Sequence, residues 1–141
     1  MTITWFILAS AAVFAACSSQ TSSTPSPDGS RDQYPGGTAE QKADWAKIVT
    51  LEDQAKALVR TDGCVSEGDC KTAGVGSRAC GGPRYYLVYC SRATDVAALT
   101  RKLDEVAAAE RAFNIKYKLA STCEFRMPPA VGLVAGACSA K

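Results

Sequence analysis

Histidine is absent from the 141-residue sequence, and its seven cysteines include no Cys-x-x-Cys pair. Without a histidine base, the Ser-His-Asp and Cys-His arrangements of many hydrolases cannot be built. Zinc sites usually combine closely spaced cysteine pairs, often with histidine, so the sequence predicts no metal and no cofactor. We therefore expect a protein that is not an enzyme.

Long runs of positive charge are absent as well. The chain has 16 Lys and Arg against 14 Asp and Glu, which gives a formal net charge of +2. Proteins that bind nucleic acids usually concentrate basic side chains on one surface, where they neutralise phosphates. Nucleic acid is therefore not an expected partner.

The sequence also lacks an apolar stretch long enough to cross a bilayer, which takes about 20 residues in a helix. Residues 5–16 (WFILASAAVFAA) are uncharged and apolar and end in small residues, as in a signal peptide. Residues 18–37 are rich in Ser, Thr, Pro and Gly without apolar periodicity, which predicts a flexible linker. The expected organisation is a signal peptide over 1–16, a tether over 17–37 and one globular domain over 38–141.

The end of the signal segment, Phe14-Ala15-Ala16-Cys17, resembles the lipobox of bacterial lipoproteins, in which a hydrophobic and two small residues precede a cysteine. The resemblance implies cleavage before Cys17, a diacylglyceryl group on its thiol and an acyl chain such as palmitate on its new amino group. Two features depart from the usual pattern. Phe14 stands where Leu is common, and residues 1–4 contain no Lys or Arg.

Cleavage after Ala15, as in ordinary secretion, is the alternative and would leave Cys17 with a thiol. The odd cysteine count favours lipidation, because the use of Cys17 leaves six cysteines to pair in an oxidising envelope. Ser18 follows the lipidated position, and the sorting rule of similar enterobacterial lipoproteins implies delivery to the outer membrane. In an organism with two membranes, the domain would then face the periplasm or the cell surface.

Two segments of the domain have the periodicity of amphipathic helices. The first begins at a capping box, Thr38 to Gln41, and is expected to end near Asp62-Gly63. The second begins at Thr94-Asp95. Apolar residues recur every three or four positions in both, which predicts helices that face a core. They are Ile48, Leu51, Ala55, Leu58 and Val59 in the first helix, and Val96, Leu99, Leu103, Val106, Phe113 and Tyr117 in the second.

Strand signals are shorter than helix signals. Residues 84–90 (RYYLVYC) are aromatic and β-branched and are bounded by a Gly-Gly-Pro turn, which predicts a strand. Residues 71–76 and 130–138 are weaker candidates, and the second follows Pro128-Pro129 and is diluted by Gly132 and Gly136. The expected fold class is α+β: a small disulfide-stapled domain with two main helices on one face of a roughly three-stranded antiparallel sheet.

Six cysteines remain for the domain and fall near the ends of the predicted elements. This placement predicts three disulfides, but six cysteines permit 15 pairings, so the connectivity stays open. The six are Cys64, Cys70, Cys80, Cys90, Cys123 and Cys138.

A distinctive turn leads into the aromatic strand. The pattern Cys-Gly-Gly-Pro-x-x-Tyr-x-x-Tyr over residues 80–89 resembles a group of small secreted bacterial proteins of unknown activity, over roughly residues 64–138. The resemblance supplies no catalytic residues. That group has Ser where this chain has Cys90, which leaves the partner of Cys90 open. The glycines and proline are also explained as turn-forming residues.

Two further patterns suggest chemistry but have simpler explanations. Asp62, Glu67 and Asp69 lie in or directly before the loop from Cys64 to Cys70, where an acidic solvated turn is expected in place of a catalytic carboxylate pair. Residues 74–79 (GVGSRA) imitate a dinucleotide-binding fingerprint, but Cys80 and a proline follow where a helix is needed. We interpret neither pattern as a site.

A candidate binding face comes from alternation in the strand at residues 84–90. If the disulfide residue Cys90 faces the helices, Tyr85 and Tyr89 lie on the opposite, open face beside Arg84. Aromatic rings with polar tips are enriched in binding surfaces. The alternative is that these rings are covered and belong to the core.

These observations predict a membrane-anchored envelope lipoprotein whose domain is a non-catalytic binding or interaction module. The lipid anchor provides the contact with the membrane, and an envelope protein or a cell-wall polymer is the expected partner. The alternative function is inhibition of a secreted hydrolase, such as a lysozyme or a peptidase. In that case the loop from Cys64 to Cys70, or Arg78, would enter the enzyme cleft.

Overall fold

A computed structural model of the chain describes residues 37–120 and 123–141. The predicted signal peptide, Cys17 and the linker up to residue 36 lie outside the described residues. Within the described part, no helix is long and apolar enough to cross a membrane. In chain order the elements are α1 (Ala39–Leu58), a short 3-10 helix η1 (Glu67–Asp69), β1 (Cys70–Val75), β2 (Tyr85–Cys90), α2 (Val96–Lys116), β3 (Val131–Val134) and β4 (Ala137–Ala140).

Helix α1 begins at the predicted capping box. The backbone N–H of Gln41 donates to Thr38 Oγ1 over 3.3 Å, and the N–H of Thr38 donates to Gln41 Oε1 over 2.7 Å. The helix ends at Leu58, earlier than the expected Asp62-Gly63, because Val59 turns into extended backbone. The next residue, Arg60, then donates its N–H to Thr94 Oγ1 over 3.1 Å, which ties this exit to the start of α2.

Helix α2 begins where the sequence predicts. The carboxylate of Asp95 accepts a hydrogen bond of 2.9 Å from the backbone N–H of Ala98, which satisfies one donor that the first turn leaves unpaired. Most of the predicted apolar face is confirmed, because Leu99, Leu103, Val106 and Phe113 are buried. Val96, in the first turn, is 37% exposed and does not belong to the buried face.

The strands form two antiparallel pairs, so the expected single sheet of about three strands is not what the chain builds. In one pair, β1 and β2 run from Cys70 opposite Cys90 to Val75 opposite Tyr85. In the other, β3 pairs with β4. The segment expected as one strand over 130–138 is itself interrupted by a turn, in which Ala135 and Gly136 take φ of 49° and 82°.

An irregular segment, residues 60–62, lies between the two pairs of strands. The N–H of Cys90 donates to Arg60 O and the N–H of Cys138 donates to Thr61 O, each over 2.7 Å. Asp62 forms an isolated antiparallel bridge with Ala137. This segment takes up hydrogen-bonding groups at the ends of β2 and β4, which explains why the four strands do not join into one sheet.

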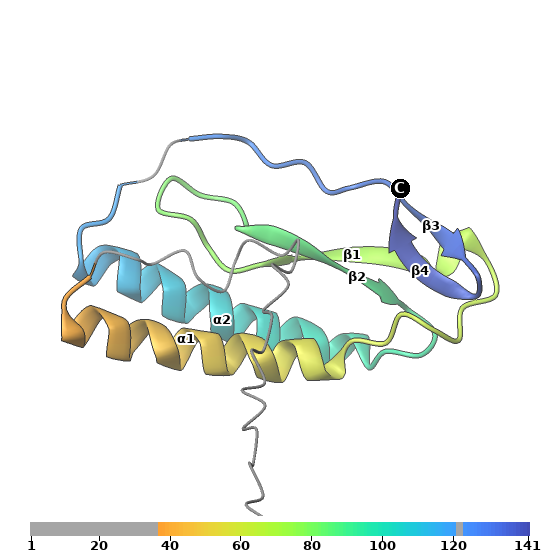
Figure 1. The fold of residues 1–141 in the computed structure, drawn as a ribbon, viewed down its shortest axis with the longest axis horizontal. Coiled ribbons are helices and arrows are strands. Elements are labelled where there is room, and N and C mark those ends of the chain that lie inside the picture. The colour runs from red at the N-terminus through yellow and green to blue at the C-terminus, as the bar shows by residue number, and fades with distance from the viewer. Residues whose placement is uncertain (1–36, 121–122) are drawn as a thin grey trace, which may run out of the picture.

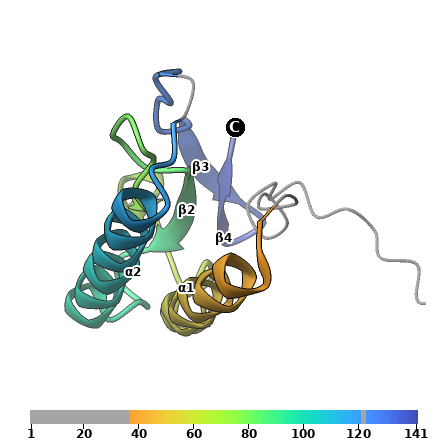
Figure 2. The same cartoon turned by 90° about the vertical axis from the view of Figure 1, so that its left-hand side faces the viewer.

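The domain has three layers. Helices α1 and α2 lie side by side beneath the β1–β2 hairpin, and the β3–β4 hairpin lies beyond it (Figures 1 and 2). The helix side of the core contains Ile48, Ala55, Val75, Tyr89, Leu99, Leu103, Val106 and Phe113. A second cluster joins the hairpins and contains Cys64, Cys70, Cys90 and Cys138, with Val88, Val131 and Leu133 packed against them.

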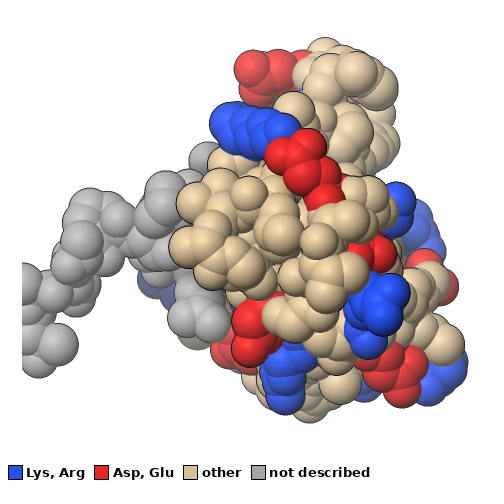
Figure 3. All heavy atoms as spheres, turned by 90° about the vertical axis from the view of Figure 1, so that its right-hand side faces the viewer, with Lys and Arg blue, Asp and Glu red and all other residues tan. Residues whose placement is uncertain are grey.

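The end of the molecule that carries β3 and β4 displays both signs of charge. Acidic and basic side chains are interspersed there around an uncharged centre (Figure 3). One such pair joins Lys141 Nζ to Glu67 Oε1 over 2.9 Å. Both partners are exposed, and exposed pairs contribute little to the free energy of folding.

Candidate functional site

Arg84, a member of the predicted binding face, lies in a buried cluster of charges. Its Nε donates to Glu110 Oε2 of α2 over 2.9 Å, and its Nη2 is paired with Glu52 Oε2 of α1. The two glutamates are only 1% and 3% exposed. Arg84 therefore connects both helices to the start of β2.

Tyr85 and Lys56 complete this cluster around Glu52. Tyr85 donates its hydroxyl to Glu52 Oε1 over 2.6 Å, and Lys56 Nζ lies 2.8 Å from the same oxygen. Burial alone would raise the pKa of Glu52, but the hydrogen bonds from Lys56, Tyr85 and Arg84 outweigh it and the pKa is lowered. Burial, together with the bond to Glu52, raises the pKa of Tyr85.

Glu110 shows the opposite balance. Burial raises its pKa, and the attraction and hydrogen bonding of Arg84 do not fully offset this effect. For Arg84, burial favours the neutral form, but Glu110 and Glu52 outweigh it and raise the pKa. The cluster is thus a set of mutually paired charges, and removal of one partner would leave another charge buried and uncompensated.

The open face predicted for Arg84, Tyr85 and Tyr89 does not form. Tyr89 is 9% exposed and belongs to the helix-side core, with Tyr85 and Leu87 packed against that core. The expected alternation is inverted, because the disulfide of Cys90 packs between the two hairpins and not against the helices. The alternative interpretation of these rings as core residues agrees with the structure.

The turn that follows β1 is fixed to α2. Ser77 donates its N–H to Glu110 Oε2 over 3.0 Å, and Asn114 Nδ2 donates to Ser77 O over 2.7 Å. Gly76 has a φ of +77°, and a Cβ there would lie 2.1 Å from Glu110 Oε2. Only glycine fits beside this carboxylate. The imitation of a dinucleotide fingerprint is therefore the end of a strand and its turn.

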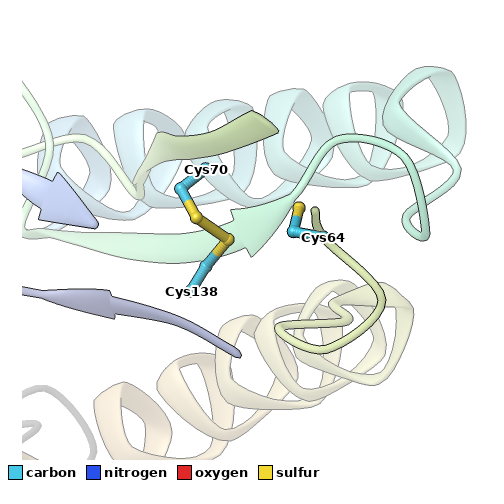
Figure 4. A group of neighbouring side chains, drawn as sticks. All are labelled: Cys64, Cys70 and Cys138. Atoms are coloured by element: carbon cyan, nitrogen blue, oxygen red, sulfur yellow. A yellow bond between two sulfur atoms is a disulfide. The ribbon is translucent and has the colours of Figure 1, made fainter. Parts of the chain in front are cut away.

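Two disulfides lie in the cysteine cluster that joins the hairpins. Cys64 is bonded to Cys90, and Cys70 is bonded to Cys138. The sulfur atoms of Cys64, Cys70 and Cys138 lie within 4.8 Å of one another, and Figure 4 shows Cys64 beside the Cys70–Cys138 bridge. Sulfur atoms held in disulfides offer no thiolate, so this cluster is not a metal site.

The remaining two cysteines of the domain lie next to each other. Cys80, in the turn between β1 and β2, and Cys123 are both exposed, and their side chains are hydrogen-bonded to each other. This hydrogen bond with Cys80 is the largest of the effects that raise the pKa of Cys123. A raised pKa keeps the thiol neutral near pH 7, which is unlike the activated thiolate of a cysteine nucleophile.

Residues 123–130, here called the strap, run along the outer side of the β1–β2 hairpin, away from the helices (Figures 1 and 2). The guanidinium of Arg78 donates to the carbonyl of Glu124, and the hydroxyl of Tyr86 donates to the carbonyl of Arg126 over 3.2 Å. Both bonds reach the backbone of the strap. Its apolar side chains stay in solvent, with Phe125 85% exposed and Met127 70% exposed.

The acidic loop between Cys64 and Cys70 is organised by its own side chains. Asp69 Oδ2 accepts hydrogen bonds from the N–H of Ser66 over 3.1 Å and from its hydroxyl over 2.9 Å. These bonds, with burial acting against them, lower the pKa of Asp69. This arrangement fits the expected acidic turn.

An open groove runs between α1 and α2 and is lined in part by Asp44, Phe113 and Lys116. Its charges are already paired, since Lys116 Nζ lies 2.7 Å from both Asp44 Oδ2 and Glu40 Oε1. Hydrogen bonds from Lys116 first, and then from Lys47 and Tyr117, lower the pKa of Asp44. The groove offers little unpaired charge to a ligand.

The sequence contained a signal for the buried cluster that the binding-face interpretation missed. Glu52 lies four residues after Ile48 and three before Ala55, and Glu110 has the same spacing to Val106 and Phe113. Both glutamates therefore occupy core positions of their helices. For the strap, the signal was an apolar pair, Phe125 and Met127, in a stretch with no helical or strand periodicity.

The strap, with the Cys80–Cys123 pair at its start, carries two exposed apolar side chains, Phe125 and Met127, on a backbone that accepts hydrogen bonds from Arg78 and Tyr86. Comparison of the chain with protein-family profiles, with characterised proteins and with solved structures gives no significant match.

Proposed function

We propose that this protein is a lipid-anchored envelope protein whose domain binds a partner without catalysing a reaction, and that the strap makes the contact. The observation that carries this proposal is the exposure of Phe125 and Met127 on a segment whose backbone is bonded to Arg78 and Tyr86. Large apolar side chains that stay in solvent on an ordered segment are typical of an interaction surface.

The fixed backbone favours recognition. Association loses less conformational entropy when the contacting segment is already held in place. Phe125 and Met127 are two positions apart and both exposed, so one partner surface can contact both side chains. Aromatic residues and Met are enriched at the centre of protein interfaces, which favours an envelope protein over a cell-wall polymer as the partner.

The anchor supports the same function. Acyl chains on Cys17 contribute roughly 0.8 kcal/mol for each buried methylene, and two or more chains give stable membrane attachment. The linker predicted from the composition of residues 18–37 would hold the domain on average about 25 Å from the bilayer. The domain then needs no membrane-binding face of its own and can meet partners in the periplasm or at the cell surface.

A non-catalytic role is supported by the pairing of the charges. The buried carboxylates of Glu52 and Glu110 share Arg84, and Asp44 is bonded to Lys116. A general acid or base needs access to a substrate proton, which these paired groups lack.

The test is site-specific crosslinking in cells that make the full protein. A photo-crosslinking phenylalanine analogue at position 125 should give one discrete crosslinked protein, and the double variant Phe125→Ser, Met127→Ser should lose the complex on purification. Val65 and Val134 provide the matched control, because they are 74% and 59% exposed and lie outside the strap. Equal crosslinking from positions 125 and 134, or loss of the complex in Val65→Ser, Val134→Ser, would refute the assignment to the strap.

Inhibition of a secreted peptidase is the second candidate function, and the strap favours it over the elements expected from the sequence. Arg78 is turned toward the strap carbonyl, and the loop before Cys70 is an acidic turn. A held, extended segment with an exposed Phe125 is suited to a cleft that accepts peptide chains. Slow cleavage between residues 125 and 128 with tight inhibition, abolished by Phe125→Ser, would support this function over simple binding.

A further inference from the structure

We propose that Cys80 and Cys123 form a third disulfide, and that this bond is the one that an external thiol can open while the domain stays folded. The bond would fasten the start of the strap to the β1–β2 turn. The inference concerns a covalent site and its reactivity. The oxidising compartment and the consequence for partner binding rest on the proposed function.

The geometry supplies the first argument. The two cysteine side chains are hydrogen-bonded to each other, although they come from segments far apart in the sequence. Arg78, two residues before Cys80, donates to the carbonyl of Glu124, directly after Cys123. The turn and the strap are therefore held together next to the cysteine pair, whose sulfur atoms are already neighbours.

The other cysteines supply the second argument. Cys64, Cys70, Cys90 and Cys138 are consumed in two bridges, so Cys80 and Cys123 are the two that remain in the domain. In an oxidising compartment two neighbouring thiols are expected to pair. Their contact selects one pairing among those that the sequence left open.

Exposure distinguishes this pair from the two bridges. The four bridged cysteines are at most 7% exposed, whereas Cys80 and Cys123 are exposed to solvent. A thiolate must reach a sulfur atom to exchange with it, so reduction of the buried bridges requires opening of the domain. Reduction of a Cys80–Cys123 bond does not.

The oxidation requires a disulfide as co-reactant, from an envelope oxidoreductase or a small molecule such as oxidised glutathione. One cysteine loses its proton, attacks the external disulfide and forms a mixed disulfide, which releases the first external thiol. The second cysteine, also as the thiolate, displaces the second external thiol. The pair loses two electrons and two protons, one sulfur–sulfur bond breaks and another forms.

Opening the bond changes how the strap is held. With the disulfide closed, the strap has a covalent attachment at its start and the hydrogen bonds from Arg78 and Tyr86. With the disulfide open, hydrogen bonds to exposed backbone remain, and backbone exchange in the strap should become faster. The redox state of the pair therefore sets the order of the proposed contact surface.

Peptide mapping tests the bond directly. The full, acylated protein is alkylated in acid-quenched detergent extract and digested with trypsin without reductant. The expected products are one species that joins residues 79–84 to 119–126, and a second that joins 61–71, 85–92 and 127–141. Recovery of 79–84 and 119–126 as separate alkylated peptides from freshly extracted protein would overturn the disulfide.

Graded reduction tests its selectivity. With increasing dithiothreitol under native conditions, Cys80 and Cys123 should become reactive toward an alkylating label at a reductant concentration at least tenfold lower than the other four cysteines. In denaturant this difference should vanish. Equal midpoints under native conditions would refute selective opening.

Hydrogen exchange and partner capture separate the two proposals. In the variant Cys80→Ser, Cys123→Ser, hydrogen exchange in residues 123–130 should be at least tenfold faster, and exchange in α1 and α2 should be unchanged. Unchanged exchange in the strap would refute its attachment by the disulfide. If peptide mapping finds the Cys80–Cys123 bond but the variant Phe125→Ser still captures the partner, the disulfide is supported and the proposed function is refuted. If the two cysteines are not bonded but Phe125→Ser loses the partner, the proposed function is supported and the disulfide is refuted.

Discussion

Cys70 and Cys90 lie directly opposite each other in the β1–β2 ladder, yet neither is bonded to the other. Cys90 is bonded to Cys64, after α1, and Cys70 is bonded to Cys138 in β4, with Cα separations of 5.6 and 5.4 Å. One opposed residue pair of the β1–β2 hairpin thus attaches both the segment that follows α1 and strand β4 through disulfides.

The two bridges should differ in their contribution to stability. They span 26 and 68 residues, and constraint of the unfolded chain grows with loop length. Removing either pair by Cys→Ala substitution should cost about 2–5 kcal/mol, with the loss of Cys70–Cys138 larger by about 0.9 kcal/mol. Urea unfolding of both double variants measures the difference. A smaller cost for Cys70–Cys138 would contradict the chain-entropy explanation.

Arg84 should be essential for the fold. Arg84→Ala leaves the buried carboxylates of Glu52 and Glu110 without their shared cation, and we expect a loss of about 3–5 kcal/mol in the free energy of unfolding. Lys47→Ala, which removes an exposed partner of Asp44, should change it by less than about 0.5 kcal/mol. Chemical denaturation compares the two, and similar small effects would argue against the buried cluster.

The cluster also predicts the response to acid. The pKa of Glu52 is lowered from its ordinary value of 4.5, so Glu52 stabilises the fold above that pH and loses this contribution as the pH falls toward its folded pKa. Stability should therefore decrease below about pH 4.5. Glu110, whose pKa is raised, gains its proton first in the folded state and opposes this loss.

Two variants separate these contributions. Glu52→Gln should flatten the decrease of stability in acid, and Glu110→Gln should make it steeper. Urea midpoints measured from neutral pH to about pH 3 provide the comparison. A steeper decrease in Glu52→Gln would show that the sign assigned to Glu52 is wrong.

Gly76 and Gly136 form a matched pair of glycines. Their φ angles are +77° and +82°, but a Cβ would collide with Glu110 at Gly76 and meet nothing within 4 Å at Gly136. Gly136→Ala should cost only the left-handed backbone term, about 1–2 kcal/mol. Gly76→Ala should cost about 3–5 kcal/mol, because it also displaces a buried carboxylate. Equal melting temperatures of the two variants would contradict this interpretation.

The anchoring proposal predicts the chemistry of the mature N-terminus. Mass spectrometry of the full protein should find Cys17 as the first residue with acyl mass attached, and Cys17→Ala or globomycin should prevent processing. An N-terminus at Ala16 or Ser18 without acyl mass would refute lipidation. With an N-terminus at Ala16, the mature protein would keep Cys17 as a seventh cysteine with a thiol.

The helices were predictable from the sequence because their signals are local. The capping box at Thr38 and the cap at Asp95 set both starts, and the apolar periodicity identified Leu99, Val106 and Phe113 as core residues. The end of α1 was placed too late, because its exit depends on the bond from Arg60 to Thr94, 34 residues away. A contact at that distance leaves no local signal.

The sheets and the contact surface depended on information that one strand does not contain. The face of β2 was assigned from Cys90 on the assumption that its disulfide faces the helices, whereas the partner of Cys90 lies on the other side. Without the pairing, Tyr85 and Tyr89 were assigned to solvent. The strap was missed for a related reason, since its order comes from Arg78 and Tyr86 and not from its own residues.

Cys64 is the first cysteine of the described residues and follows α1, so both bridges lie beyond that helix. A mechanical pull applied from the N-terminal side therefore reaches α1 before it reaches a covalent crosslink. Residues 38–63 precede the first bridged cysteine. Fully extended, they would span roughly 90 Å before the force reaches the Cys64–Cys90 disulfide. Under tension α1 can therefore unfold and extend first, while the Cys70–Cys138 bridge still joins the two hairpins.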